Sequence, residues 1–594
     1  MKDFIKYVFA TVTGIVVFFL IMGILFVISL VGLAASSASS VPVEKNSVFT
    51  LMLSGTVEER ASEDIVGQLT GQVSENMGLD DIINSIKKAK DNEDIKGIYL
   101  ESGLFSIDTP ASAHAIREAL LDFKKSGKWI VAYGDSYTQT AYYICSVADK
   151  VYLNPQGMID WHGLAANPYF LKDLLAKFGV KYQLCKVGKY KSAPEMMTAD
   201  QMSEPNREQV TAYITGIWKV MLKDVADSRK IPVDSLNAYA DRFIALADQP
   251  DLVKMKMVDK LLYTDEVKGE IKKMLKIDAD DDIPQLSLSD MISVKGKKEK
   301  GEKIAIYYAY GSIVDSEAMN MLNGGGHSIV GKTTAEDLRK LADDDDVKAV
   351  VFRVNSGGGS AVASEQIRHA LKLVKAKKPV VVSMGGAAAS GGYWISSPAN
   401  YIFAEPTTIT GSIGIFGLIP NFSGLVTDKL GVTFDGVKTN KFAGYETELI
   451  MGKDTEDIMA QLQTHINRGY QSFLNVVSEG RGIKPEQVHE IAQGRVWLAT
   501  DAIKIKLVDK LGSLDDAVKK AAELAKLDEY HTAKYPGEVN WLDNLLSKDN
   551  NGSFLDAELR ELLGDAYLPL IQIRNDIKNN SRVQARMLDD IRVK

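Results

Sequence analysis

The chain repeats itself at a spacing of about 250 residues, and this internal repeat limits its possible folds more than any other feature. The first copy contains the apolar segment KGIYLES from Lys96, and the second contains KAVVFRVNS from Lys348, 252 positions later. A second matching pair is AYYICS at 141–146 and GYWISS at 392–397, 251 positions apart. A duplication of this length in a chain of 594 residues predicts two successive units of the same fold.

Each copy alternates strand-like apolar segments with helical ones. This pattern predicts an α/β fold in which helices pack on sheets rich in parallel strands. We expect the first copy at 46–286 and the second at 303–536. A charged, Gly-containing linker is predicted at 287–302, and a polar C-terminal helical extension at 537–594.

The N-terminus carries a long uncharged segment. No charged residue occurs from Val8 to Ala35. A helix of this length is long enough to cross the roughly 30 Å hydrocarbon core of a bilayer. Lys2 and Lys6 precede this segment, so residues 1–45 are predicted to be a cytoplasmic N-terminus, a transmembrane anchor and a spacer. A cleaved signal peptide is the alternative, because small residues follow, but its apolar core usually spans only about 7–15 residues.

Composition narrows the function classes. The formal net charge is −8, which gives no reason to expect nucleic acid binding, since that usually needs a basic face. The two cysteines, Cys145 and Cys185, are too few for a disulfide framework and are expected to be buried. A single disulfide between them is the alternative if this region lies outside the cytoplasm. No metal-site spacing occurs. The segment GHSIVGKT at 326–333 fits a phosphate-loop pattern but lacks a preceding buried strand, so we expect no cofactor.

The densest chemical signal lies at 351–417. Ser390 follows the strand-like PVVVSM and an AAA run, and Gly391 and Gly392 come next, before a predicted helix. A nucleophilic serine needs such exposure at a strand end, small neighbours and backbone N–H groups for an oxyanion. The glycine turn at 357–359 offers further N–H groups. A tight packing turn without chemistry would have the same pattern.

The general base is not fixed by local pattern. None of the seven histidines lies in a motif around Ser390, although a triad can assemble from distant residues. A lysine can serve if burial lowers its pKa enough to make it neutral. Lys191 in YKSA lies 199 residues before Ser390, and Lys441 in NKFAG lies 51 residues after it, at the matching place in the second copy.

These segments resemble the signal peptide peptidase A family in its long, two-repeat bacterial form. The resemblance covers most of the chain and rests on SMGGAAASGGYWIS, TGSIGIFG and YKSA. It implies two tandem copies of a fold similar to the Clp protease subunit and the crotonases. It also implies Ser390 as nucleophile, Lys191 as base and Ser412 as the residue that orients the lysine. Lys441 remains an alternative base, because short relatives with a single repeat place their lysine at that spacing.

The glycine turn departs from the pattern of this family. The resemblance implies an oxyanion hole formed by the amides of Gly358 and Gly391. The family turn usually reads NSPGGS, whereas this chain has Gly357 in place of the proline. At the position that corresponds to Ser390, the first copy has Gln139, which cannot act as a nucleophile. We therefore expect the first copy to supply the base and the second to supply the serine.

The predicted function is that of a membrane-bound serine endopeptidase with a Ser-Lys dyad. The resemblance implies that it degrades cleaved signal peptides and other short apolar peptides. It also implies a homotetramer in the bacterial inner membrane with its body on the periplasmic side. The alternatives are a crotonase-like acyl-CoA enzyme, which would use acidic residues, and an inactive membrane scaffold. Cleavage-site preference, and whether the dyad forms within or between subunits, do not follow from the sequence.

Overall fold

The computed structural model describes most of the chain between residues 41 and 537. The described ranges are 41–61, 76–296, 300–316, 327–452 and 455–537, together with 13–14, 17–18 and 21–22. Met1–Ala533 form one compact unit and Lys534–Lys594 a second. Most of the predicted anchor and nearly all of the predicted C-terminal extension lie outside the described residues. Within the described ranges, no helix has the length and apolarity needed to span a bilayer.

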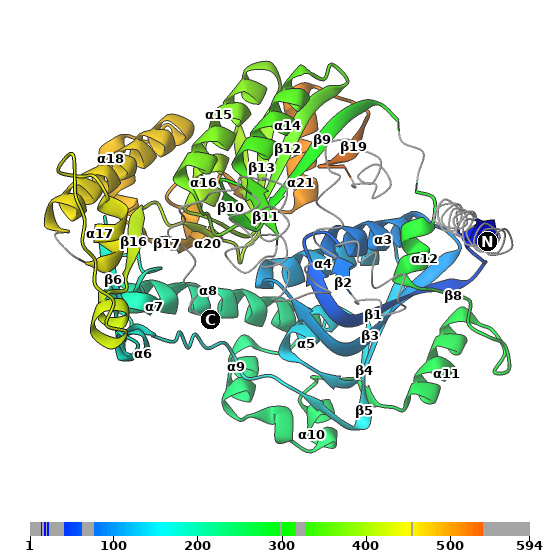
Figure 1. Ribbon diagram of the computed structural model, residues 1–594. Helices are drawn as coiled ribbons and strands as arrows, with labels where there is room; N and C mark the ends of the chain where they lie inside the picture. The colour runs from blue at the N-terminus through cyan, green and yellow to red at the C-terminus, as the bar shows by residue number, and fades with distance from the viewer. Residues whose placement is uncertain are drawn as a thin grey trace, which may run out of the picture. The chain divides into compact units, whose positions relative to one another are not determined.

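The first copy is built on a parallel sheet (Figure 1, blue and cyan). The strand order is β2 (Asn76–Gly78), β1 (Ser47–Glu58), β3 (Ile95–Ile107), β4 (Trp129–Tyr137), β5 (Lys150–Ile159) and β7 (Lys260–Leu261), with β8 (Gln285–Leu286) beside β1. All of these pairings are parallel. The predicted parallel-rich α/β fold is therefore confirmed for this copy.

The second copy repeats this sheet with an addition at one edge. The strand order is β17 (Val496–Leu498), β15 (Ile409–Gly411), β13 (Val380–Ala389), β12 (Val347–Ser356), β9 (Glu302–Tyr310) and β19 (Tyr530–Tyr535), with β14 (Tyr401–Ala404) between β13 and β18 (Lys510–Leu511). The pairings among β9, β12, β13, β14, β15 and β18 are parallel, whereas β15 pairs antiparallel with β17. Two short strands, β10 (Ser312–Val314) and β11 (Ser328–Val330), form a separate parallel pair.

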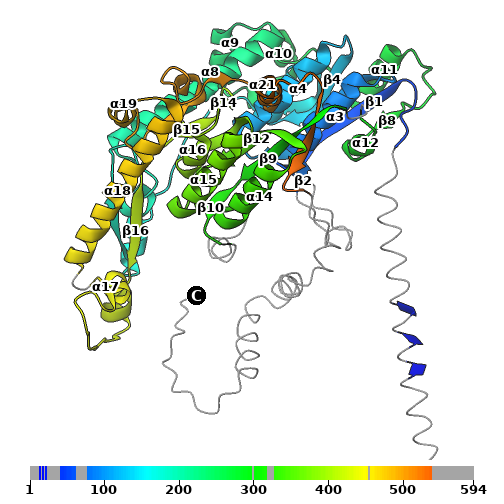
Figure 2. The same ribbon diagram turned by 90° about the horizontal axis from the view of Figure 1, so that it is seen from above.

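Helices cover both faces of each sheet, because alternate residues of every strand point to opposite sides. In the second copy, Ile306 and Val351 pack against α21 (Leu514–Ala525). In the first copy, Tyr99 and Val131 pack in the same way against α11 (Thr264–Leu275). Helices α14 (Gly331–Asp343) and α15 (Ala361–Lys377) lie side by side in Figure 2. Helices α3 (Leu79–Asp91) and α4 (Pro110–Lys124) pair in the first copy.

After each sheet comes a helical region with one long helix. These long helices are α8 (Glu204–Arg229) and α18 (Glu456–Arg481). Helices α5 (Gln139–Cys145) and α16 (Gly391–Ser396) lie between strands of their sheets. The other short helices are α6 (Lys172–Lys177), α7 (Glu195–Thr198), α9 (Val233–Asp241), α10 (Gln249–Lys254), α12 (Leu288–Ser293), α17 (Tyr445–Met451), α19 (Pro485–Ile491) and α20 (Ala499–Ala502). Helix α12 lies in the predicted linker and packs on α3. Both cysteines are buried and free.

Two kinds of contact join the copies. Strand β6 (Lys181–Lys186) of the first copy pairs antiparallel with β16 (Phe416–Asn421) of the second, beside α17 and α18 (Figure 1, left). Charged side chains are also buried between the sheets. Arg353 Nε donates to Glu59 Oε1 at 2.5 Å, and both side chains are at most 4% exposed. His114 Nδ1 lies 2.8 Å from Glu405 Oε2. The interface therefore contains buried charged groups of each copy that pair with groups of the other.

The buried Arg353–Glu59 pair gives a stability prediction. Glu59→Gln removes the carboxylate and leaves a buried guanidinium without its counter-charge, so the free energy of unfolding should fall by about 3–5 kcal/mol. Urea denaturation followed by circular dichroism measures the change. The control is Asp457→Asn, which removes the partner of Lys441 in an ion pair whose side chains are 67% and 64% exposed and should cost less than about 1 kcal/mol. Equal losses in the two variants would contradict the role assigned to Glu59.

Candidate active site

Ser390 occupies a strained turn between β13 and α16. Its φ and ψ angles are 54° and −119°, a backbone conformation that residues other than glycine rarely adopt. The Ser390 N–H donates to Gly411 O at 2.9 Å, and the Ser390 carbonyl accepts from the N–H groups of Tyr393 and Trp394. The strain is therefore held by the strand on one side and by the first turn of α16 on the other. This geometry presents the hydroxyl at the strand end, as the sequence pattern predicts.

The Lys191 amine reaches this hydroxyl from the first copy. Lys191 Nζ lies 3.0 Å from Ser390 Oγ, 3.0 Å from Ser412 Oγ and 3.1 Å from Ser412 O. These are three acceptors for the three hydrogens of an ammonium group. The residue is only 4% exposed, and burial lowers the pKa of Lys191 from 10.5 to about 8. A substantial fraction of neutral amine therefore exists near pH 8, and that form can accept a proton from Ser390.

The position of Lys191 is fixed by backbone contacts with the second copy. Val187 N–H donates to Ile415 O at 3.3 Å, just beyond the β6–β16 pair, and Tyr190 N–H donates to Gln493 O at 3.0 Å. Gly494 lies directly against the lysine, since a Cβ there would come within 2.6 Å of the Lys191 nitrogen. The base segment is thus held between two segments of the other copy, one just before β16 and one before β17.

Ser412 completes the surroundings of the amine. It follows β15 with φ of 50°, a second strained serine in the site. Its N–H donates to Arg495 O at 2.7 Å, which ties it to the chain entering β17. Because both its hydroxyl and its carbonyl accept from Lys191 Nζ, the amine has little freedom to turn away from Ser390.

The glycine turn lies against the nucleophile. A Cβ on Gly358, whose φ is 103°, would come within 2.6 Å of Gly391 N and 2.9 Å of the Ser390 Cβ. The Gly358 N–H donates to Ser356 Oγ at 3.1 Å. The Gly391 N–H has no acceptor among the described residues. The two amides predicted as oxyanion donors are therefore close together, but only that of Gly391 is unengaged.

The other basic candidates lie elsewhere. Lys441 is exposed and pairs with Asp457 at 2.5 Å. The buried His114 contacts Glu405, and His327 contacts Glu58. In the described part of the chain, no histidine hydrogen-bonds to Ser390 Oγ.

The first copy has a different arrangement at the matching place. Gln139 is the first residue of α5, and Ser390 is the residue just before α16, so both lie at the start of equivalent helices. Its Oε1 accepts from His162 N–H and Gly163 N–H, and its Nε2 donates to Gly163 O. The side chain closes the neighbouring loop and offers no nucleophile.

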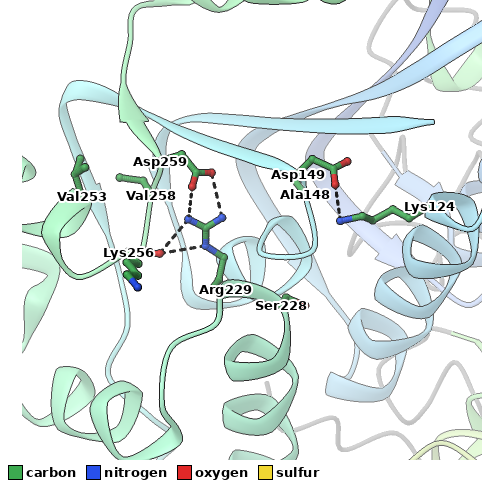
Figure 3. A pocket seen from close by; sticks show the side chains of 9 residues that line it. All are labelled: Lys124, Ala148, Asp149, Ser228, Arg229, Val253, Lys256, Val258 and Asp259. Carbon is green, nitrogen blue, oxygen red and sulfur yellow. Dashed lines mark hydrogen bonds and ion pairs between the residues drawn. The ribbon is translucent and has the colours of Figure 1, made fainter. Parts of the chain in front are cut away.

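A cavity of about 410 Å³ lies apart from the serine and lysine (Figure 3). Four of its charged side chains form ion pairs, Arg229 with Asp259 at 3.0 Å and Lys124 with Asp149 at 2.8 Å. The second copy repeats the first of these pairs as Arg481 on Asp509. We interpret the feature as a structural clamp common to both copies.

One functional candidate escapes sequence reasoning. Gln209 on α8 is 2% exposed and hydrogen-bonds to both neighbours of Lys191 in the chain. No local motif marks it, because its partners are 17 to 19 residues away in the chain or in the other copy.

The architecture is that of a duplicated α/β enzyme with a serine at the end of a parallel strand. The chain belongs to peptidase family S49, whose sequence pattern matches twice, at residues 122–278 and 372–528. It is therefore a serine protease with two tandem S49 repeats.

Related proteins span most of the chain. It is 38% identical to Protease 4 of Salmonella typhi over 527 residues, 86% of this chain and 82% of that protein. It is 35% identical to Protease 4 of Haemophilus influenzae over 572 residues, 92% and 89% of the two chains. The chloroplastic serine protease SPPA of Arabidopsis thaliana is 28% identical over 492 residues, 82% and 70%. Among solved structures, a ClpP1 mutant of Listeria monocytogenes matches with a TM-score of 0.24 and 16% identity over 36% of this chain and 94% of that one.

The buried amine makes stability depend on pH. Between about pH 8 and pH 10.5 the unfolded chain binds more protons at Lys191 than the folded chain, so stability rises with pH across that window. Below pH 8 the full cost of the buried charge is present, roughly 3 kcal/mol. Lys191→Met should therefore stabilise the protein at pH 7 by about 2 kcal/mol, allowing for its lost hydrogen bonds, and the gain should vanish near pH 10.

Urea denaturation at pH 7 and pH 10 measures this gain. Lys441→Met, at an exposed position, is the control and should show little change at either pH. A Lys191→Met variant that is less stable than the parent by the same amount at both pH values would contradict the stability cost assigned to the buried charge of Lys191.

Proposed function

We propose that this S49 protease works through a Ser390–Lys191 dyad. The observation that carries the proposal is the 3.0 Å contact between the Lys191 amine and the Ser390 hydroxyl, in surroundings that lower the pKa of the amine to about 8. This is the geometry that a general base needs to take a proton from a nucleophile.

The reaction follows from these positions. Neutral Lys191 takes the proton as Ser390 Oγ attacks the peptide carbonyl. The Gly391 N–H stabilises the oxyanion, and the Gly358 N–H joins it once it turns away from Ser356 Oγ. Protonated Lys191 then gives its proton to the leaving amine, and an ester remains on Ser390. Water, deprotonated by the same lysine, hydrolyses this ester, and Ser412 holds the amine in line throughout.

The two copies divide the labour in this proposal. The first, at 46–286, supplies the base, and the second, at 303–536, supplies the nucleophile, with the linker at 287–302 between them. Gln139 supports this division, because its amide oxygen and nitrogen are engaged by the loop at 162–163.

Three substitutions test the dyad. Ser390→Ala and Lys191→Ala should each lower kcat/KM by about 10³-fold or more, because the two groups act as one unit. Lys441→Ala should remain within about twofold of the parent. The assay follows cleavage of a fluorescence-quenched apolar decapeptide by the full chain, and the rate of the parent should rise with pH through about 8. A fully active Lys191→Ala variant, or an inactive Lys441→Ala variant, would assign the base elsewhere.

The proposed substrates are cleaved signal peptides and other short apolar peptides at a membrane. The sequence supports this setting through the uncharged segment from Val8 to Ala35, which we propose anchors the chain in the bacterial inner membrane with its body in the periplasm. The likeness to the signal peptide peptidase A family also supports a homotetramer.

Membrane fractionation tests the anchor. The full chain should stay with membranes after alkaline carbonate washing, whereas a chain lacking residues 1–40 should be released. The full chain extracted in mild detergent should have the mass of four copies. Release of the full chain by carbonate would contradict a spanning anchor, and a monomeric mass would contradict the tetramer.

A further inference from the structure

A buried glutamine connects the base segment to β17, the strand paired with the one that precedes Ser412. The Gln209 side chain is almost fully buried, at 2% exposure. It lies on α8, outside the serine and lysine contacts described above. Both ends of its amide are used, and each end contacts a different copy.

The amide nitrogen faces the chain around Lys191. Gln209 Nε2 donates to Tyr190 O at 3.0 Å and to Ser192 Oγ at 3.0 Å, the residues immediately before and after the lysine. A third acceptor, Asn206 Oδ1, lies at 3.2 Å on the same helix. The nitrogen therefore holds the backbone before the proposed base and the hydroxyl of the residue after it.

The amide oxygen faces the second copy. Gln209 Oε1 accepts from Val496 N–H in β17 at 3.0 Å. Val496 is paired with Gly411, and the adjacent Arg495 carbonyl accepts from Ser412 N–H at 2.7 Å. A single side chain thus links the lysine segment to β17, which in turn is hydrogen-bonded to the segment of the orienting serine.

We propose that Gln209 is a positioning residue that sets the register of Lys191 against Ser390 and Ser412. This inference rests on the proposed dyad. The amine must meet two hydroxyls and a carbonyl at once, although it is carried by a segment of the other copy. A displacement of about 1 Å in such a group costs about 10²-fold in rate, so the register of the two segments matters for catalysis.

The charged groups beside this contact are compensated. Arg495 pairs with Glu208 at 2.9 Å, and its guanidinium also donates to Tyr190 Oη at 2.9 Å and covers the Tyr190 ring. The hydrogen bond from Tyr190 and the nearby Arg495 lower the pKa of Glu208, so this carboxylate stays charged above neutral pH. A change in the pH profile between 7 and 10 therefore reports on the lysine.

The test variant is Gln209→Met, which keeps the length and burial of the side chain and removes its hydrogen bonds. We expect kcat for the quenched decapeptide to fall about 10–100-fold, with KM within about twofold. We also expect the rising limb of the rate to move upward by about half a pH unit or more, because a loosened segment admits water to the amine and restores part of its ordinary pKa. The pH dependence of Ser390 labelling by a fluorophosphonate should move in the same direction.

The matched control is Gln139→Met, which removes a buried glutamine with three hydrogen bonds in the first copy. It should lose stability in urea yet keep the parental pH midpoint. If Gln209→Met does not fold, Gln209→Asn keeps the amide but is too short to reach both segments, and should give a smaller shift of the same sign.

The outcomes separate this inference from the proposed dyad. A folded Gln209 variant with the kcat and pH midpoint of the parent, beside an inactive Lys191→Ala variant, overturns the positioning role alone. An active Lys191→Ala variant overturns the dyad, and the positioning role with it.

Discussion

The buried amine of Lys191 is the contact on which the site depends. An ammonium group without water is unfavourable unless acceptors replace the water, and here the hydroxyls of Ser390 and Ser412 and a backbone carbonyl take that role. Every one of these acceptors belongs to the other copy. The buried lysine therefore joins the two copies through hydrogen bonds that are shielded from solvent. Low solvent access lowers the pKa of the amine, and the same burial that costs stability makes the group a usable base.

Duplication has preserved the scaffold while the chemistry has diverged. The helices α11 and α21 cover equivalent faces of their sheets, and the clamp of Arg229 on Asp259 recurs as Arg481 on Asp509. At the strand end the copies differ, since a strained serine stands in one and a glutamine fixed to its own loop in the other. Packing requirements act equally on both copies, whereas one complete site leaves the other free to change.

Much of this organisation is visible in the sequence because it is local or periodic. The repeat predicts two α/β units, and the parallel sheets of the structure and the two S49 matches confirm them. The turn at Ser390 is also local, since a strand, a serine and two glycines are consecutive. The proximity of Lys191 to this serine rested on a family resemblance and on spacing, which left Lys441 as a rival.

The rest is non-local and could not be predicted in this way. The pairing of β6 with β16 joins strands more than 200 residues apart, and nothing in either strand specifies its partner. Gln209 has no motif, because its role is defined by backbone groups of two distant segments. The engagement of the Gly358 amide by Ser356 depends on the rotamer of one hydroxyl, which composition and spacing do not determine.

The β6–β16 pair has a consequence for the protein during its translation. A ribosome releases Lys191 long before it makes the strand at 416–421 and the glycine at 494 that hold the lysine in place. Until then the amine stays in water at its ordinary pKa, even after Ser390 has been translated. The proposed dyad therefore cannot form until both copies have been translated, and the proposed activity is absent from the nascent chain.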